Sequence, residues 1–225
     1  MSTTEATAAE PPEPAPAPLR RDAERNRERV LLAARQLFAV RGLGVGFNEI
    51  AHHAGVGVGT VYRRFADKDE LVRAALDEPI RALVVVAEQA EGAPHAWDGL
   101  ELLLGQITEL LVDNLGLRDI ALGGSAWESL GPEAAARIAE AVEVLMARAT
   151  AEGSLRGGVD SGDIMMLLWL VTDLAEHAAV VRPGLHRRYL RVLLDGLRAA
   201  PGRTALGPGA AAQDVEAISR LWAGL

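Results

Sequence analysis

The sequence predicts an all-α protein in which a small amino-terminal unit of three helices precedes a larger helical bundle. Two observations lead to this prediction. From Ala96 onward, apolar residues recur at intervals of three and four, as on an amphipathic helix, and no run alternates as a strand does. Residues 47–65, FNEIAHHAGVGVGTVYRRF, divide into two short amphipathic segments around Gly55, where a helix can end in a left-handed conformation. These segments predict two helices joined by a tight turn.

The second of these helices presents a face suited to a polyanion. Turning residues 58–65 at 3.6 residues per turn places Val61 and Phe65 on the buried side. The opposite side then carries a glycine, a hydroxyl and two arginines, which permits close approach to phosphates and to base edges. This arrangement predicts a helix-turn-helix unit that binds DNA.

The distribution of charge favours the same interpretation. The whole chain has a net charge of -8, which taken alone argues against nucleic acid. Residues 20–73, however, contain 11 basic and 7 acidic side chains, whereas the segments on both sides are acidic. A basic module on an acidic body is the pattern expected when only one part of a protein contacts DNA.

The chain divides into four predicted regions. Residues 1–19 are rich in Pro, Ala and Glu and predict a disordered tail. A helix-turn-helix domain is expected over 20–77, an all-α body over 78–200, and a flexible segment with a short terminal helix over 201–225. Because Pro79 has no amide hydrogen, we expect the linking helix that starts at Lys68 to break or kink just before it.

Periodicity and punctuation place the helices of the body. Pro132 suits the first turn of one helix, and Asp160 or Ser161 can cap the next helix, which starts at about residue 162. The expected helices cover residues 97–114, 118–122, 132–152, 162–181, 185–199 and 215–222.

Residues 25–76 resemble the amino-terminal DNA-binding domain of the TetR (tetracycline-repressor-like) family of bacterial transcriptional regulators. The resemblance rests on a first helix ending RVLLAARQLFAVRG, the residues EIA, the turn AGV, the helix GTVYRRF and the start DKDEL. It implies a cytoplasmic, homodimeric repressor that binds a palindromic double-stranded operator and is released by a small-molecule effector.

The resemblance also implies roles for individual residues. Thr60, Tyr62, Arg64 and Lys68 align with groups that hold phosphates, and Asn48, Val58, Gly59 and Arg63 align with positions that face base edges. The chain departs from the family where Gly46 and Gly57 replace capping Ser or Thr, and where Val58 replaces a frequent Lys.

The family binds its effectors inside the carboxy-terminal helices, so bulky and lightly polar side chains there are candidates for the pocket. Plain core is the alternative for each of them, and Asp173 and His177, four residues apart, can bind a ligand or each other. The candidates are Trp97, Trp127, Met146, Met165, Met166, Trp169, Asp173 and His177.

The family generally dimerises through a four-helix arrangement of its last two long helices. We expect the apolar faces of residues 162–181 and 185–199 to form this interface, although intrachain core remains open for each residue. The predicted interface residues are Ile164, Leu167, Leu168, Val171, Leu190, Leu193, Leu194 and Leu197.

Other functions have weaker support in the sequence. No cysteine is present, and the adjacent His52 and His53 point about 100° apart on a helix, so we expect no metal site and no cofactor. The glycine-rich runs lack the G-x-G-x-x-G spacing and no catalytic motif stands out, which leaves an enzyme as the less favoured alternative. No membrane segment or export signal is expected. An activator, or a regulator controlled by a protein partner, is the other alternative.

Overall fold

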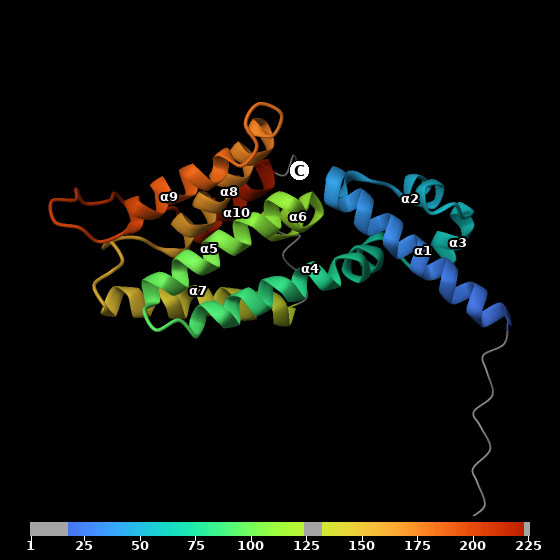
Figure 1. Ribbon diagram of the computed structural model, residues 1–225, viewed down its shortest axis with the longest axis horizontal. Coiled ribbons are helices and arrows are strands. Elements are labelled where there is room, and N and C mark those ends of the chain that lie inside the picture. Colours follow the sequence, from blue (N-terminus) through green and yellow to red (C-terminus); the bar gives the residue numbers. More distant parts are fainter. Residues whose placement is uncertain (1–17, 124–131, 223–225) are drawn as a thin grey trace, which may run out of the picture.

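The computed structural model describes residues 18–123 and 132–222, and within these ranges it is all-α, as predicted (Figure 1). No strand occurs among the described residues; an isolated β-bridge joins Leu155 to Arg198. No helix in the described part is both long and apolar enough to cross a membrane. The elements are α1 (Pro18–Arg41), the 3₁₀ turn η1 (Gly42–Gly44), α2 (Phe47–Ala54), α3 (Val58–Arg64), α4 (Lys68–Glu91), α5 (Ala96–Asp113), α6 (Leu115–Leu122), α7 (Pro132–Ala151), α8 (Ser161–Ala178), α9 (Leu185–Leu197) and α10 (Ala212–Trp222).

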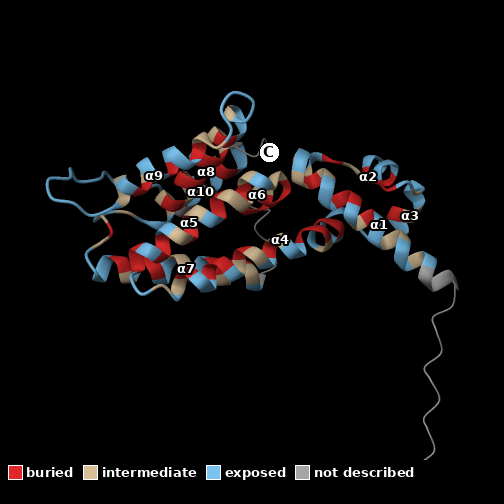
Figure 2. Ribbon diagram, in the orientation of Figure 1, coloured by how far each residue is buried: buried red, intermediate tan, exposed pale blue. Residues whose placement is uncertain are grey.

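The helices form a head and a body that share α4. The head consists of α1, α2, α3 and the first turns of α4, and the body contains α5 to α10 (Figure 1). Helix α4 runs from the head into the body, where it packs against α5 and α7, and α6 lies at the end of the body that faces the head. Buried residues follow the facing sides of the helices in both parts (Figure 2).

The head has the predicted helix-turn-helix geometry. Ile50, Ala51 and Ala54 of α2 are buried, and Gly55 ends the helix with φ 63°, in the left-handed region that favours glycine. On α3, Val61 and the following Phe65 are fully covered. The local sequence pattern therefore predicts both helices and the turn between them correctly.

Helix α4 does not break at Pro79, so of the two outcomes predicted there, a break or a kink, the break is wrong. The helix is continuous from Lys68 to Glu91 with Pro79 inside it. Proline cannot donate to the carbonyl four residues earlier, which here belongs to Ala75. Arg35 of α1 donates from Nε to that carbonyl oxygen at 3.2 Å. A side chain from another helix therefore supplies the hydrogen bond that proline removes.

The far end of α4 is held by α7. Arg148 donates to the carbonyl oxygens of Glu91 and Ala93 at 2.7 and 2.9 Å, where the helix has no further amides of its own. Arg137 forms a bidentate pair with the Glu91 carboxylate, and this hydrogen-bonded guanidinium lowers the pKa of Glu91. The body thereby fixes one end of α4 while the head occupies the other.

Several predicted helix boundaries also differ from the structure, by one to three residues. Helix α1 starts at Pro18, slightly inside the region predicted as a disordered tail, and the rest of that tail lies outside the described residues. Helix α6 begins at Leu115 rather than at 118, because the Asn114 side chain accepts from the Leu117 amide at 3.0 Å and caps the helix.

Candidate nucleic-acid interface and effector cavities

Helix α3 presents an exposed face that carries most of the predicted DNA contacts. Gly59, Arg63 and Arg64 are exposed, Thr60 is half-buried, and the Tyr62 side chain is 61% exposed. Asn48 is exposed on the neighbouring α2, and Val58 at the start of α3 is 40% exposed. The structure thus brings these residues together on one accessible surface of the head.

Contacts within the head orient two of these side chains. The rings of Tyr62 and Phe47 pack edge to face with centroids 4.9 Å apart, so Tyr62 is anchored on one side while it stays largely exposed. A guanidinium nitrogen of Arg63 lies 3.5 Å from Thr60 Oγ1, at the limit of a hydrogen bond.

Arginines of α1 contact the helix-turn-helix within the head. Arg29 donates to the carbonyl oxygen of Gly55 at 3.2 Å, in the turn between α2 and α3. The guanidinium carbon of Arg27 lies 5.9 Å from the centre of the Phe65 ring, within the range of a cation–π contact. At least two of the arginines near the start of α1 therefore have structural partners inside the head.

Lys68 differs from the other predicted DNA contacts because its ammonium group donates to the carbonyl oxygen of Leu43 in η1. The amide of Leu43 donates to the Asp119 carboxylate of α6 at 2.8 Å. Lys68 is exposed, but its position in the structure ties α4 to the turn that precedes α2.

The body contains an apolar cavity of about 180 Å³. Five helices line it: α4, α5, α6, α7 and α8. Its apolar walls come from residues such as Leu104, Val142 and Ile164, and its few polar groups include Glu143 and Ser161, both of which are exposed side chains. Such a site suits a small apolar molecule with one polar end.

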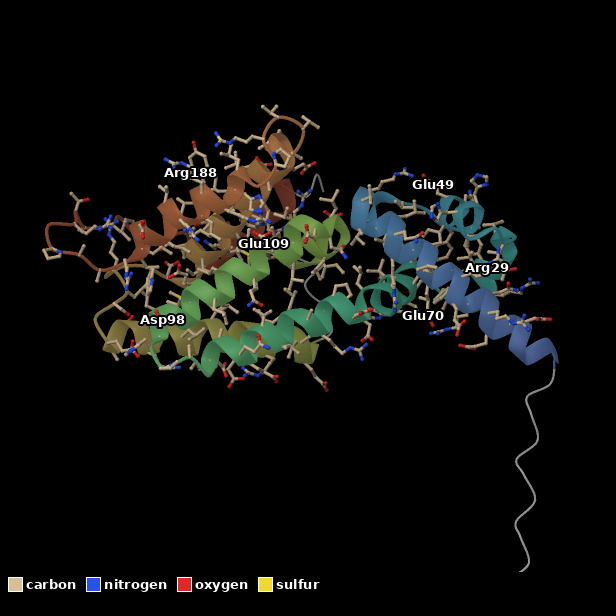
Figure 3. The ribbon with its side chains drawn as sticks, in the orientation of Figure 1. Arg29, Glu49, Glu70, Asp98, Glu109 and Arg188 are labelled. Carbon is tan, nitrogen blue, oxygen red and sulfur yellow. The ribbon has the colours of Figure 1, made fainter. Side chains whose placement is uncertain are left out.

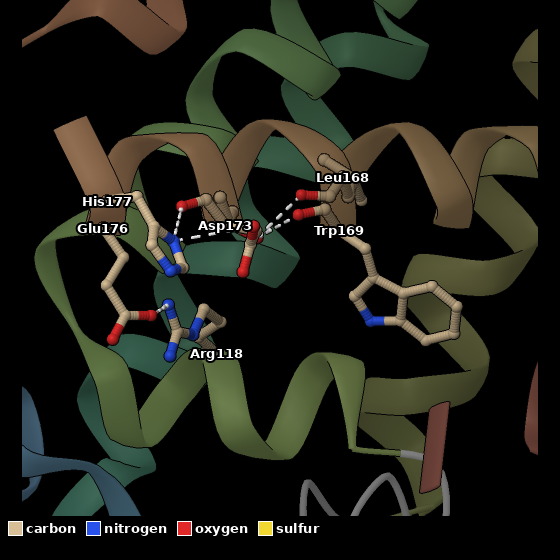
Figure 4. Close-up of polar contacts among 7 residues, drawn as sticks. Arg118, Leu168, Trp169, Asp173, Glu176 and His177 are labelled. Atoms are coloured by element: carbon tan, nitrogen blue, oxygen red, sulfur yellow. Dashed lines mark hydrogen bonds and ion pairs between the residues drawn. The ribbon is translucent and has the colours of Figure 1, made fainter. Parts of the chain in front are cut away.

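A second cavity, of about 290 Å³, lies between α6 and α8. We call it the polar cavity because charged side chains line it beside apolar ones such as Leu122. Arg118 donates to Glu176 at 2.6 Å (Figure 4). Asp119, Asp173 and Trp169 also line this cavity. The carbonyl oxygen of Leu122, at the end of α6, accepts from the Trp169 indole at 3.1 Å. Leu122 also lines the apolar cavity, so α6 forms a wall of both cavities.

The predicted effector residues separate into three groups. Met165 lines the apolar cavity, whereas Trp169 and Asp173 line the polar one. Trp97 and Met146 are buried and line neither cavity, and the guanidinium of Arg198 lies 5.0 Å from the Trp97 ring. Met166 is half-buried outside both linings, and Trp127 lies outside the described residues.

His177 lies beside the polar cavity and is mostly exposed. Its Nδ1 is 2.9 Å from the carbonyl oxygen of Asp173 and 3.6 Å from the carboxylate of the same residue. The backbone hydrogen bond to Asp173, with the charge of that carboxylate, raises the pKa of His177. The pair predicted from the i, i+4 spacing is thus present, as Figure 4 shows. Among the described residues, no group of three or more side chains could hold a metal ion.

The residues predicted for dimerisation belong mainly to the core of the single chain, and their part in a dimer stays a prediction. Ile164, Leu167, Leu168, Val171, Leu190 and Leu194 are each less than 9% exposed, and Leu193 and Leu197 are half-buried against the same core. Ile164 and Leu168 also line the apolar cavity. The helical period identified an apolar face correctly, but that face is covered by other helices of the same chain.

Sequence reasoning missed most of the apolar cavity. Its lining residues include Leu83, Leu104, Ile107, Leu111, Ile138 and Val142, which have the same helical spacing as ordinary core residues. The hollow results from how five helices converge, and nothing in the spacing of one helix indicates it. Asp119 was also missed, because its partner lies 76 positions earlier in the chain.

Comparison with known proteins agrees with this geometry. Residues 30–75 match the family model described as bacterial regulatory proteins of the tetR family, and residues 98–199 match the carboxy-terminal domain of SbtR-like transcriptional regulators. An HTH-type transcriptional regulator of Staphylococcus aureus strain USA300 is 29% identical over 101 residues. That match covers 44% of this chain and 55% of the relative, so the chain spans about half the length of the curated relatives it matches.

Solved structures extend the similarity over most of the chain. A TetR regulatory protein from Mycobacterium vanbaalenii is 36% identical, with 81% of this chain and 100% of that chain covered and a TM-score of 0.47. A TetR family regulator from Marinobacter aquaeolei VT8 shares the fold at 15% identity, with coverages of 80% and 100% and a TM-score of 0.56. Because the two family models together match well over half of the residues, the chain belongs to the TetR family of bacterial regulatory proteins.

Proposed function

We propose that this regulator is a repressor that binds a palindromic operator as a homodimer and releases it when a small molecule occupies the body. The observation that carries the proposal is the exposed face of α3, where Arg63 and Arg64 stand beside Gly59 while Val61 is buried. Basic side chains next to a glycine allow the helix to lie close to a groove and to contact phosphates on its edges.

The roles assigned to the residues of this surface can be tested with DNA duplexes that the protein selects from a random pool. Arg63 and Asn48 are assigned to base edges, and Thr60, Tyr62 and Arg64 to phosphates. An Arg63→Ala variant should lose about 1–3 kcal/mol of discrimination at one base position. Arg64→Ala should weaken binding to all duplexes alike and reduce the salt dependence. Arg73→Ala, an exposed arginine of α4, is the matched control. Failure of the wild-type protein to enrich any sequence would refute specific DNA binding.

The apolar cavity is the site we assign to the effector. Its lining favours a compact apolar molecule, and Glu143 and Ser161 at the polar part favour a hydrogen-bond donor or cationic group on that molecule. Release follows if the ligand binds the conformation that misfits the operator more tightly than the one that fits it. A preference of several kcal/mol is needed to empty the operator.

Filling this cavity provides the test. Small apolar compounds would be screened for release of the selected duplex, and Val142→Phe should abolish the response because the added ring occupies the cavity. Val144→Phe changes the same helix at a side chain that is 40% exposed and does not line the cavity, so it should still respond. Equal responses from both variants would exclude the apolar cavity as the effector site.

Dimerisation is assigned to the outer faces of α8 and α9. Leu170, Tyr189 and Val192 are large apolar side chains that are 53%, 45% and 54% exposed in the single chain. A two-fold operator requires two recognition helices about 34 Å apart, which one chain cannot supply. Val192→Glu should shift sedimentation toward monomer, whereas Val180→Glu, in the exposed segment between α8 and α9, should not.

Reporter expression in a deletion strain distinguishes a repressor from an activator. Loss of the protein should raise expression from the promoter that contains the selected site. A fall in expression would favour the activator alternative. Release of the operator by the effector in a purified system, with no other protein present, would argue against control by a protein partner.

A further inference from the structure

Leu43, in the turn η1 between α1 and α2, is held at both of its main-chain polar groups. Its amide donates to Asp119 Oδ2 of α6 at 2.8 Å, and its carbonyl oxygen accepts from the Lys68 ammonium of α4. We call these three residues the Leu43 clamp. The clamp fixes the turn that leads directly into the helix-turn-helix from two other elements of the fold.

The turn is shaped to receive Asp119. Gly42 has φ 67°, and a Cβ atom built on it would lie 2.3 Å from Oδ2 of Asp119. Any side chain at position 42 would therefore be strained in its backbone and would collide with the carboxylate. Helix α6 also approaches α1 closely at Gly116, where a Cβ would lie 2.9 Å from the Phe38 Cβ. The absence of two side chains allows α6 to contact the head.

Helix α6 is fixed to the body at its other end. The Leu122 carbonyl accepts from both the Trp169 indole of α8 and the Ser219 hydroxyl of α10, and Ser219 is only 4% exposed. Asp119 itself is one of the residues that line the polar cavity. Helix α6 therefore connects the walls of both cavities to the Leu43 main chain through a single carboxylate.

We propose that Asp119 is a positioning residue for DNA recognition: it holds the Leu43 turn so that α2 and α3 are ordered before the protein meets DNA. Without the clamp, the head must be ordered during binding, and that ordering lowers affinity. The inference rests on the proposed role of α3 in reading DNA.

The test measures affinity for a duplex selected by the wild-type protein, using fluorescence anisotropy. Asp119→Ala should weaken binding about tenfold, the effect of losing one charge-assisted hydrogen bond. Asp119→Asn retains an oxygen that can accept from the Leu43 amide and should remain within about threefold of wild type. The slope of affinity against salt should be unchanged in both variants, because no phosphate contact is removed.

The direction of the change in DNA affinity distinguishes a positioning role of Asp119 from an effect of its charge alone. Removing a negative charge should by itself raise affinity for DNA. Asp69→Asn measures that effect close to the head, since Asp69 is exposed in the first turn of α4. Asp98→Asn, exposed on α5 at the end of the body away from the head, measures it where salt screens the charge from DNA (Figure 3). A wild-type affinity for Asp119→Ala would overturn the proposal. So would an equal loss in Asp119→Ala and Asp119→Asn, because it would show that an oxygen accepting from the Leu43 amide does not preserve binding.

Gly42→Ala provides an independent variant that alters the clamp from the other side. It should weaken binding more in the wild-type background than in Asp119→Ala, because the second background has already lost the carboxylate that collides with the new methyl group. Additive losses would contradict a shared mechanism.

Hydrogen exchange at the Leu43 amide separates failure of this inference from failure of the proposed function. In free protein, Asp119→Ala should accelerate exchange at that amide at least tenfold and leave the α8 amides unchanged. If the wild-type protein selects no DNA sequence, the proposed function fails, and the exchange rate still decides whether the clamp exists. Unchanged exchange at Leu43 would refute the clamp in either case.

Discussion

The hydrogen bond from Arg35 to Ala75 makes the stability of α4 depend on a residue of α1. Pro79 leaves the Ala75 carbonyl without a helical partner, and Arg35 Nε donates to it at 3.2 Å. Replacing Arg35 with Ala should destabilise the protein by about 1–2 kcal/mol, in the range of one hydrogen bond from a charged group to a partly buried carbonyl. Because the Arg35 side chain is 43% exposed, the lower half of that range is expected.

The ion pair of Arg35 with Glu78 adds little to this estimate. Its N–O distance is 3.7 Å and its partner is 76% exposed, so solvent screening limits it to a few tenths of a kcal/mol. Arg73→Ala, an exposed arginine on α4, serves as the matched control and should change stability by less than about 0.5 kcal/mol.

A double-mutant cycle with Pro79→Ala isolates the mechanism. Alanine restores the amide that can donate to Ala75, so Arg35→Ala should cost less than about 0.5 kcal/mol in that background. Urea unfolding monitored by circular dichroism, at one fixed protein concentration, gives the four free energies of unfolding. The same cost for Arg35→Ala in both backgrounds would show that the guanidinium does not substitute for the missing amide.

Three further predictions concern stability. Glu109 pairs with Arg187 and with the buried His186, and hydrogen bonds, first from Arg187 and then from His186, lower the pKa of Glu109. The ionised Glu109 therefore stabilises the folded protein fully above the unfolded pKa of about 4.3, and this contribution is lost as pH falls through the lower folded pKa. Thermal melts between pH 5 and pH 3 should thus lose less stability in Glu109→Gln than in wild type, and a steeper loss would contradict this assignment. Gly55→Ala places an alanine at φ 63° and should cost about 1–2 kcal/mol by urea unfolding; no change would mean that the turn rearranges. Arg148→Ala removes both donors at the end of α4 and should cost about 1–3 kcal/mol; a melting temperature equal to that of wild type would show that water replaces them.

The sequence predicts features that depend on neighbours along the chain. The apolar spacing in residues 47–65, with Gly55 between the two runs, is enough for α2, the turn and α3, because each signal acts within one or two helical turns. Pro79 shows the limit of such reasoning. Its local chemistry predicts a break or kink, and the residue that bonds the freed carbonyl, Arg35, lies on another helix.

In the body, the sequence predicts which helix faces are apolar but not what covers them. Ile164 and Leu168 have the spacing of a face that must be covered, and they are covered. Periodicity does not indicate whether a second chain, other helices of the same chain or a ligand does the covering. In the structure these residues pack within the chain and border a cavity, while the exposed apolar side chains of α8 and α9 are others, including Leu170 and Val192.

The Leu43 clamp has a consequence for how this protein can vary. Asp119 and Lys68 contact an amide and a carbonyl, which every residue type except proline offers in the same place. Related chains can therefore exchange the residue at position 43 freely for hydrophobic packing without altering the link between body and head. Proline alone at that position would remove the donor to Asp119, and substitutions that affect the link should otherwise concentrate at the partners and at Gly42.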